Sequence, residues 1–220
     1  SVNTDSGFSI VSWTSPNSNV NTIAHGLGAV PKMIIMKKRG SAGGWITYHQ
    51  AMGNTHGMFL STANAQEDNA AFFNDTSPTS TVFTTGTDAG LINNTMMAYC
   101  FAEKTGFNKF GSYVGNGNNN GTFVYTGFKP AFIMVKRAVG GSGNWHITDN
   151  KRDPFNVNDA YLSANVDSAE SDFDHSDFLS NGIKFKTNND GFNQDGNTYI
   201  YMSFAENPFV SAAKIPVTAR

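Results

Sequence analysis

The stretch that decides the fold reads Pro31-Lys32-Met33-Ile34-Ile35-Met36-Lys37-Lys38, in which four consecutive apolar residues end in two lysines. A run of this length is short for a helix and is typical of a β-strand. Because it is continuously apolar rather than alternating, we expect both faces of the strand to be covered. A glycine-rich turn at residues 40–44 then leads to Trp45, which is the pattern of a β-hairpin.

The same pattern returns in the second half of the chain. Pro130-Ala131-Phe132-Ile133-Met134-Val135-Lys136-Arg137 is followed by a glycine-rich turn at residues 140–144 and by Trp145. Further blocks recur in the same order: Gly7-Phe8 and Gly106-Phe107, Met58-Phe59-Leu60-Ser61 and Ala160-Tyr161-Leu162-Ser163, Phe101-Ala102-Glu103 and Phe204-Ala205-Glu206. Matches in one order, with an offset that drifts as loop insertions would cause, indicate an internal repeat.

Each repeat contains several short apolar or alternating segments separated by turn residues. The sequence therefore predicts an all-β fold made of two internally repeated β-sandwich (jelly-roll-like) units packed together. We place the first repeat at residues 7–105, the second at 106–210 and a C-terminal tail at 211–220. Two arrangements remain open, since each unit can close its own sandwich or the two can merge into one. A short helix around residues 63–73 is compatible with the pattern.

Two side-chain types suggest what lies inside. We expect Trp45 and Trp145 to be core residues, because each begins a strand at the same place in its repeat. The single cysteine, Cys100, lies in an apolar run and is expected to be buried; alone, it forms no intrachain disulfide.

The composition narrows the classes of partner. Only 15% of the residues are charged, against about a quarter in typical proteins, and the net charge is -2. Asn, Ser, Thr and Gly must therefore supply the polar surface, which suits sugars or neighbouring subunits and does not suggest nucleic acid. No apolar stretch has the length of a transmembrane helix, so we expect no membrane insertion.

The search for catalytic motifs indicates a non-enzyme. There is no nucleophile elbow, zinc-binding helix motif or P-loop, and the five histidines are not at metal-ligand spacing. We therefore expect no catalytic residue, no metal and no cofactor. The acidic run from Asp172 to Asp177 could bind calcium or supply a pair of carboxylates, but we interpret it as a solvated loop.

Two loops of the second repeat, residues 116–121 and 188–197, are rich in Asn, Gly and Asp. A rigid sandwich presents such loops to partners, so they are the candidate binding segments. The candidate ligand-binding residues are Asn118, Asn119, Asn120, Asp190, Gln194 and Asp195. The matching segments of the first repeat, residues 15–19 and 87–90, are less rich in Asn. Plain turns explain the same composition, because Asn and Gly favour turns.

Several blocks carry a resemblance to a known family. They are His25-Gly26-Leu27-Gly28 before the Pro31 strand, Tyr99-Cys100-Phe101-Ala102-Glu103, Lys109-Phe110-Gly111-Ser112-Tyr113, Phe123-Val124-Tyr125-Thr126-Gly127-Phe128 and Phe204-Ala205-Glu206-Asn207-Pro208-Phe209. With them the chain resembles, from Gly7 to about Phe209, a domain of bacteriophage virion proteins that often lies near the C-terminus of tail-fibre-like chains. The residues after Phe209 depart from that pattern.

The resemblance implies a virion component, and specifically a tail-fibre or receptor-binding (adhesin) domain that recognises a host surface glycan or protein without catalysis. Its implied partners are other virion subunits. A homotrimer is expected, because a low charged fraction leaves apolar surface for neighbours. One alternative is a structural or decorating protein of the capsid or tail. Another is a polysaccharide depolymerase, which would need a carboxylate pair in a groove.

Overall fold

The computed structural model describes residues 1–16 and 20–208 and divides the chain into two compact units. The first unit comprises residues 1–62 and 66–103, while the second comprises residues 63–65 and continues from Lys104. Nearly all regular structure is β-strand, so the fold is all-β, as predicted. The tail expected at 211–220 and the last two residues of the second repeat lie outside the described residues.

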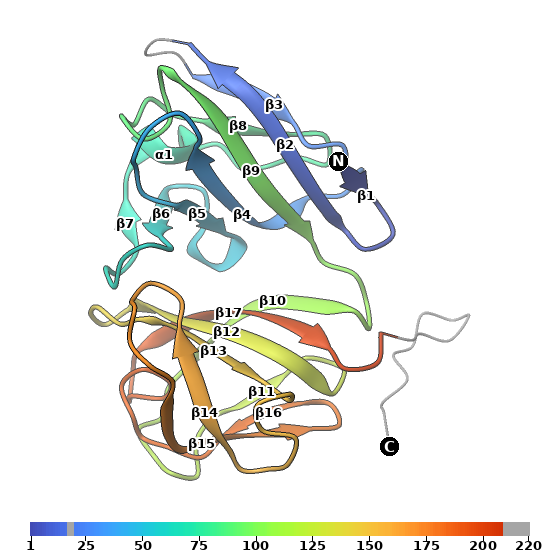
Figure 1. Cartoon of the computed structure of the whole chain (residues 1–220), viewed down its shortest axis with the longest axis vertical. Helices are drawn as coiled ribbons and strands as arrows, with labels where there is room; N and C mark the ends of the chain where they lie inside the picture. The colour runs from blue at the N-terminus through green and yellow to red at the C-terminus, as the bar shows by residue number, and fades with distance from the viewer. Residues whose placement is uncertain (17–19, 209–220) are drawn as a thin grey trace. The chain divides into compact units, whose positions relative to one another are not determined.

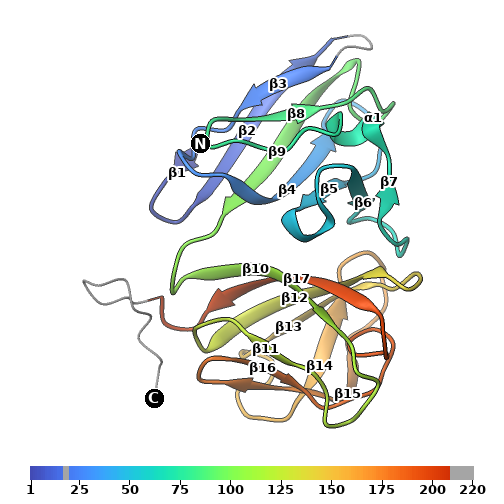
Figure 2. The same ribbon diagram turned by 180° about the vertical axis from the view of Figure 1, so that it is seen from behind.

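The first unit is a sandwich whose larger layer is a seven-stranded sheet in the order β1-β2-β9-β4-β5-β6-β7. The pair β3-β8 and the short helix α1 lie over its inner face (Figure 2). Phe72 and Phe73 of α1 and Phe83 of β8 pack in one core cluster with Ile34 and Met36 of β4. The elements are β1 (Val2–Asn3), β2 (Phe8–Ser15), β3 (Asn21–Ala24), β4 (Pro31–Lys38), β5 (Ile46–His49), the 3₁₀ turn η1 (Gln50–Met52), β6 (His56–Phe59), β7 (Glu67–Asp68), α1 (Ala70–Phe73), β8 (Val82–Thr85) and β9 (Asn94–Ala102).

The second unit is one eight-stranded sheet in the order β10-β17-β12-β13-β14-β15-β16-β11. The sheet folds over, so that its first four strands form one layer and its last four strands form the other (Figure 1). Tyr113 and Tyr199 from one layer meet Ile183 and Phe185 from the other in a common core. The elements are β10 (Asn108–Val114), β11 (Phe123–Tyr125), β12 (Pro130–Val139), β13 (Trp145–Asp149), β14 (Asn158–Ser163), β15 (Ser171–Leu179), β16 (Gly182–Phe185) and β17 (Thr198–Ala205).

The two units share an order of five paired strands, β2-β9-β4-β5-β6 in the first unit and β10-β17-β12-β13-β14 in the second. The last strand of the first unit, β9, lies between β2 and β4, and the last strand of the second unit, β17, lies between β10 and β12. The sheets then continue in the same way, through β5 and β6 in one unit and β13 and β14 in the other. No sheet formed by residues 1–16 and 20–208 contains strands of both units, so each unit closes its own sandwich and the merged arrangement is wrong.

The hairpins that follow β4 and β12 are held by the same device. Lys37 donates a hydrogen bond from its ammonium group to the carbonyl of Gly43 in the glycine-rich turn. Lys136 makes the equivalent bond to the carbonyl of Gly143, at 2.7 Å. Lys136 is fully buried, and this burial, followed by the charge of the adjacent Arg137, lowers its pKa to about 8.

The two tryptophans differ in burial. Trp145 is 1% exposed and is a core residue, as predicted. The prediction is wrong for Trp45, which is only half-buried. The physical reason is its lysine: Lys37 stays near the surface with its ammonium 5.6 Å from the Trp45 ring centre, whereas Lys136 is buried in the second unit.

Two local expectations also need correction. The acidic run from Asp172 to Asp177 is not a loop, because it forms most of strand β15 and pairs with β14 and β16. Asp172 and Asp174 are exposed, whereas Asp177 is half-buried and forms an ion pair with Lys186. The helix expected around residues 63–73 is limited to the single turn of α1, which the side chain of Asn69 caps.

The structural equivalence of β6 and β14 is shifted by two residues relative to the repeat inferred from the sequence, which aligned Phe59 with Tyr161. Phe59 pairs with Ile46 in the first unit, and Ser163, not Tyr161, takes the equivalent place opposite His146 in the second. Because side chains on a strand alternate with a period of two, this shift keeps every residue on its expected face.

The burial difference between the tryptophans predicts unequal stability effects. Trp145→Ala should lower the free energy of unfolding of the second unit by about 3–5 kcal/mol, because it removes a large buried ring. Trp45→Ala should cost about 1 kcal/mol in the first unit. Urea denaturation followed by circular dichroism measures both. Equal effects of the two substitutions would contradict the assignment.

Candidate functional site

Three loops of the second unit leave its sheet at the same end. Val114, the last residue of β10, pairs with Thr198, the first residue of β17, and Thr198 also pairs with Val139 at the end of β12. The loops 115–122, 140–144 and 186–197 therefore emerge side by side. Gly140 shows how closely they approach: it has φ +99°, and a Cβ there would lie 1.9 Å from the amide oxygen of Asn197.

The side chain of Asn193 joins two of these loops. It is fully buried, and its amide nitrogen donates to Oδ1 of Asn116 (2.8 Å) and to the carbonyls of Asn118 (3.0 Å) and Thr187 (2.8 Å). Its Oδ1 accepts from the backbone N–H groups of Asn116 (3.1 Å) and Thr122 (3.4 Å). One buried amide thus fixes the loop after β10 against the loop before β17.

The structure brings together the two loops that the sequence singled out. All six candidate residues are exposed there: Asn118, Asn119, Asn120, Asp190, Gln194 and Asp195. Gly117 in one loop approaches Asp195 in the other so closely that a Cβ on the glycine would lie 2.8 Å from that of the aspartate. Arg137 of β12 supports the second loop, with Nη1 3.0 Å from Oε1 of Gln194 and 3.6 Å from Oδ2 of Asp190.

A pocket of about 290 Å³ opens beside Asp190 in this unit. It is small for a ligand site, which typically measures about 300–1,000 Å³. Its lining is polar, with one aromatic ring: Ala63, Ser142, Gly143, Asn144, His146, Tyr161, Asn189, Asp190 and Gly191. One of the six candidate residues, Asp190, therefore belongs to both the loop end and the pocket.

Beneath the pocket lies a stack of three rings. Phe192 is sandwiched between His146 and His175, with ring centres 4.8 Å and 4.7 Å away. The edge of Tyr161 meets all three of these rings. Nδ1 of His146 lies 3.2 Å from Oγ of Ser163, so hydrogen bonding fixes the orientation of the imidazole.

Burial keeps both histidines neutral. It lowers the pKa of His146 to about 4; His175 and Lys136 act in the same direction, and Asp190 opposes them. Burial likewise lowers the pKa of His175 to about 4, against the opposing effects of a backbone hydrogen bond with Ala160 and the charges of Asp153 and Asp174. At neutral pH the floor of the pocket is therefore uncharged.

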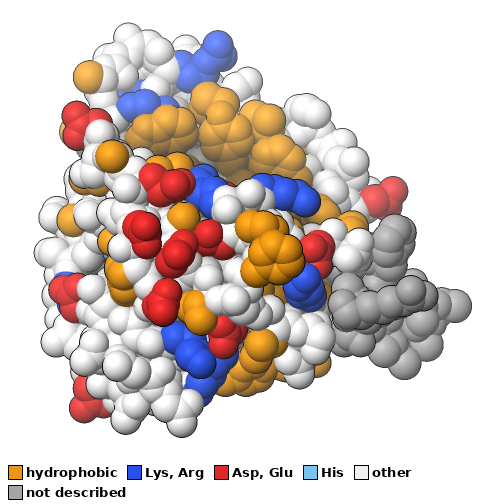
Figure 3. Space-filling view, turned by 60° about the horizontal axis from the view of Figure 1, so that its bottom comes forward, with side chains coloured by type: hydrophobic (Ala, Val, Ile, Leu, Met, Phe, Trp, Pro, Cys, Tyr) orange, Lys and Arg blue, Asp and Glu red, His pale blue; other side chains and the backbone are white. Residues whose placement is uncertain are grey.

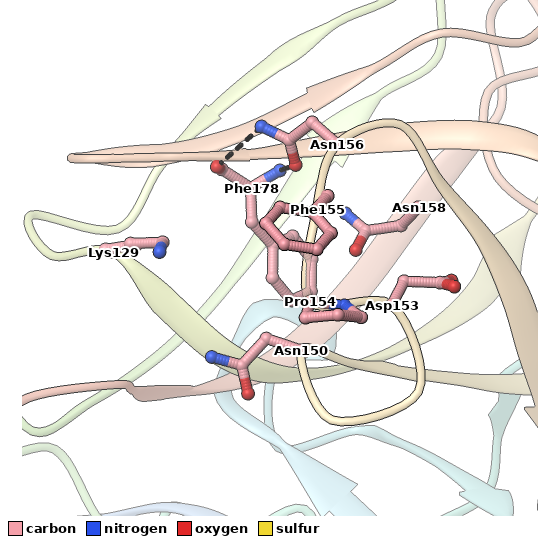
Figure 4. A pocket seen from close by; sticks show the side chains of 8 residues that line it. All are labelled: Lys129, Asn150, Asp153, Pro154, Phe155, Asn156, Asn158 and Phe178. Carbon is pink, nitrogen blue, oxygen red and sulfur yellow. Dashed lines mark hydrogen bonds between the residues drawn. The ribbon is translucent and has the colours of Figure 1, made fainter.

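A second pocket, of about 220 Å³, lies around the loop 153–158 and differs in one respect (Figure 4). Most of its polar groups are already used by the protein, but Oδ1 of Asn150 is buried without a hydrogen-bond partner among the described residues. The amide of Asn156 is paired with both backbone groups of Phe178 (2.9 and 3.0 Å), and the amide nitrogen of Asn158 donates to the carbonyl of Ser176. Phe155, at 82% exposed, adds an apolar ring to this otherwise polar lining.

Acidic side chains gather on one face of the molecule (Figure 3). In the second unit, desolvation first, and then the charges of Asp153, Asp172 and Asp174, raise the pKa of Asp159. The carboxylate of Asp153 accepts from the backbone N–H groups of Asp159 (3.0 Å) and Ala160 (2.7 Å). The linings of the two pockets contain one carboxylate each, Asp153 and Asp190, whereas glycoside hydrolases usually use a pair.

Two further properties concern metal binding and membrane-spanning helices. Among residues 1–16 and 20–208, no group of three His, Cys, Asp or Glu side chains is placed to hold a metal ion. No helix in the part of the chain that the structure describes is long and apolar enough to span a membrane.

The sequence did not single out several residues on which the site depends. Asn193 lay within the predicted loop but resembles its neighbours in composition, and only its burial distinguishes it. His146 and Tyr161 lie on strands, where the search for loops did not extend. The sequence feature that could have identified His146 is the difference between the repeats, since Ile46 occupies the equivalent place in the first unit.

Comparisons with known proteins give one match. The model of a domain family of unknown function, DUF7483, matches residues 1–208, which span both units. No curated protein and no solved structure matches the chain.

Asn193→Ala should lower the free energy of unfolding by about 2–4 kcal/mol, because it leaves several buried backbone groups without partners. It should also speed amide hydrogen exchange at Asn116 and Thr122. The matched change Asn119→Ala, at an exposed position of the same loops, should stay within about 0.5 kcal/mol. Unchanged exchange in the Asn193 variant would contradict the role given to this side chain.

The neutral histidines predict acid sensitivity. In the folded protein His146 and His175 resist protonation until pH falls to about 4, whereas in the unfolded chain they bind protons near the ordinary histidine pKa of about 6.5. The unfolded state therefore binds more protons between these values, and the free energy of unfolding should fall as pH drops from 6.5 to 4, by on the order of 5 kcal/mol in total. Denaturant titrations at a series of pH values measure this, and the double variant H146Q/H175Q should flatten the dependence.

Proposed function

The chain belongs to the DUF7483 family of domains of unknown function. From its loops and its resemblance to tail-fibre-like domains, we propose that it is a non-catalytic adhesin domain of a bacteriophage virion. It recognises a host surface glycan through the loops at one end of its second unit. The observation that carries the proposal is the convergence of two Asn-rich loops that lie far apart in the sequence and are joined by the buried amide of Asn193.

The chemistry of this end suits a glycan. Its exposed side chains are mostly amides, which donate and accept hydrogen bonds at once and so match sugar hydroxyl groups. The loops are also held in place before a ligand arrives, which reduces the entropy that binding must overcome. The single carboxylate in each pocket lining favours binding over glycoside hydrolysis.

The virion setting rests on the resemblance of the chain to tail-fibre-like domains. In that setting the chain binds other virion subunits and assembles as a homotrimer at the end of a fibre. The exposed rings of Phe155 and Tyr125, at 82% and 64%, are surfaces on which such neighbours can pack. The same rings favour the second candidate function, a structural or decorating protein of the capsid or tail.

The test is a binding assay of the isolated chain on host cells and on an array of surface glycans. Substituting Asn119, Asp190 and Asp195 together by Ala should abolish binding and leave the melting temperature nearly unchanged, because all three side chains are exposed. The matched control substitutes Ala for three exposed residues of the first unit: Asn3, Asp5 and Thr95. Full binding by the loop variant would remove this end as the adhesin site, and failure of the unaltered chain to bind cells or glycans would favour the structural role.

A further inference from the structure

His146 lines the pocket beside Asp190 with a ring nitrogen that the protein does not use. His146 is 8% exposed, and its Nδ1 is engaged by Ser163. Its Nε2 has no hydrogen-bond partner among the described residues, although the ring lines the pocket. Because the ring faces the pocket, a hydroxyl group of a ligand can form a hydrogen bond with this nitrogen.

Gly191 keeps this atom accessible. A Cβ at position 191 would lie 2.5 Å from Nε2 of His146, so any other side chain would press on the imidazole. The backbone N–H of Gly191 is held by Oδ1 of Asn189 at 2.8 Å, which fixes the loop over the ring. The space above Nε2 therefore depends on this glycine.

Further unpartnered groups surround the same space. Among the described residues, the hydroxyl of Tyr161 and the amide nitrogen of Asn189 have no hydrogen-bond partner, and the side chain of Asp190 is 66% exposed. Together they offer donors, acceptors and an aromatic ring. A sugar ring has this combination of hydroxyl edges and apolar C–H surface.

The charges favour a neutral ligand. The ammonium of Lys136 is buried and bonded to the carbonyls of Gly143 and Ala63, and Arg137 is engaged by Gln194 and Asp190. Asp190 is thus the charged group that the pocket presents, and it would repel an anionic sugar. The low pKa of His146, about 4, means that the imidazole adds no positive charge at neutral pH.

In the first unit the equivalent place is apolar. There the equivalent pair is Ile46 and Phe59, and the Phe59 ring lies so close to Gly44 that a Cβ on the glycine would be 2.5 Å away. In the second unit His146 and Ser163 replace this apolar pair. Packing of the scaffold does not need this polar pair, because the first unit has apolar residues at the same place. The polar pair therefore favours a binding role.

We propose that this pocket is the subsite for one neutral sugar ring of the host glycan, with Nε2 of His146 bonded to a sugar hydroxyl and Asp190, Asn189 and Tyr161 fixing its orientation. The inference rests on the proposed function and deepens it by naming the class of ligand and the specificity-determining side chain.

The experiment titrates the full chain with the methyl glycosides of glucose, galactose and mannose and with N-acetylglucosamine. Glucuronic acid and N-acetylneuraminic acid are the anionic probes. The readouts are the backbone amide shifts of Asn189 and Gly191 and the ¹⁵N shift of His146 Nε2. We expect at least one neutral sugar to move all three signals and the acids to leave them in place. Gly191→Ala and Asp190→Asn should each weaken that sugar tenfold or more, whereas Asn188→Ala, an exposed neighbour outside the lining, should change the affinity less than twofold.

The possible outcomes separate the two proposals. If no neutral sugar moves these signals at about 50 mM, well above a millimolar Kd, the pocket assignment is overturned. It is also overturned if a sugar moves only the signals of Asn118 to Asn120, or if both pocket variants bind the sugar as the unaltered chain does. In either case the adhesin role stands as long as the chain still binds cells. If cells are not bound but a neutral sugar moves the pocket signals and Asp190→Asn weakens it, the adhesin role fails and the sugar site stands. Asp190→Asn keeps the test valid if Gly191→Ala does not fold.

Discussion

The structure depends on where the last strand of each repeat pairs. β9 and β17 do not add to an edge: β9 lies between β2 and β4, and β17 lies between β10 and β12, each with hydrogen bonds on both sides. Neither sheet is therefore complete until the end of its repeat has been reached. Because the central place in each sheet is filled from within the repeat, each half of the chain closes a separate sandwich.

This pairing also builds the candidate site. Since Thr198 at the start of β17 pairs with the ends of β10 and β12, the loops attached to these three strands have to leave the sheet together. Side-chain hydrogen bonds then hold in place the loops that the strand register brings together. Asn193 joins the loops 115–122 and 186–197, and Arg137 supports the second of these through Gln194 and Asp190. The site is thus a consequence of strand register, stabilised by a few buried polar contacts.

The repeat provides a comparison inside one molecule. Lys37 and Lys136 cap the glycine-rich turns in the same way, and the strand order is shared, so these features belong to the scaffold. What differs is the burial of the two lysines and the replacement of an apolar pair by His146 and Ser163. The second unit accommodates these polar groups through hydrogen bonds and through histidines that burial keeps neutral. Function is therefore to be sought where the copies diverge.

The sequence by itself determined the all-β class, the repeat, the hairpins after the Pro31 and Pro130 strands, and the burial of Trp145, because these follow from local apolar patterning and turn residues. It also identified the exposed Asn-rich loops, since composition alone marks them. It could not show that β17 pairs with both β10 and β12, that Trp45 stays near the surface, or that Asp172 to Asp177 form a strand. Nor could it single out Asn193, or His146 with its free Nε2 beneath Gly191. These features depend on contacts between residues far apart in the chain, and non-local pairing, not local propensity, decides which polar atoms are satisfied.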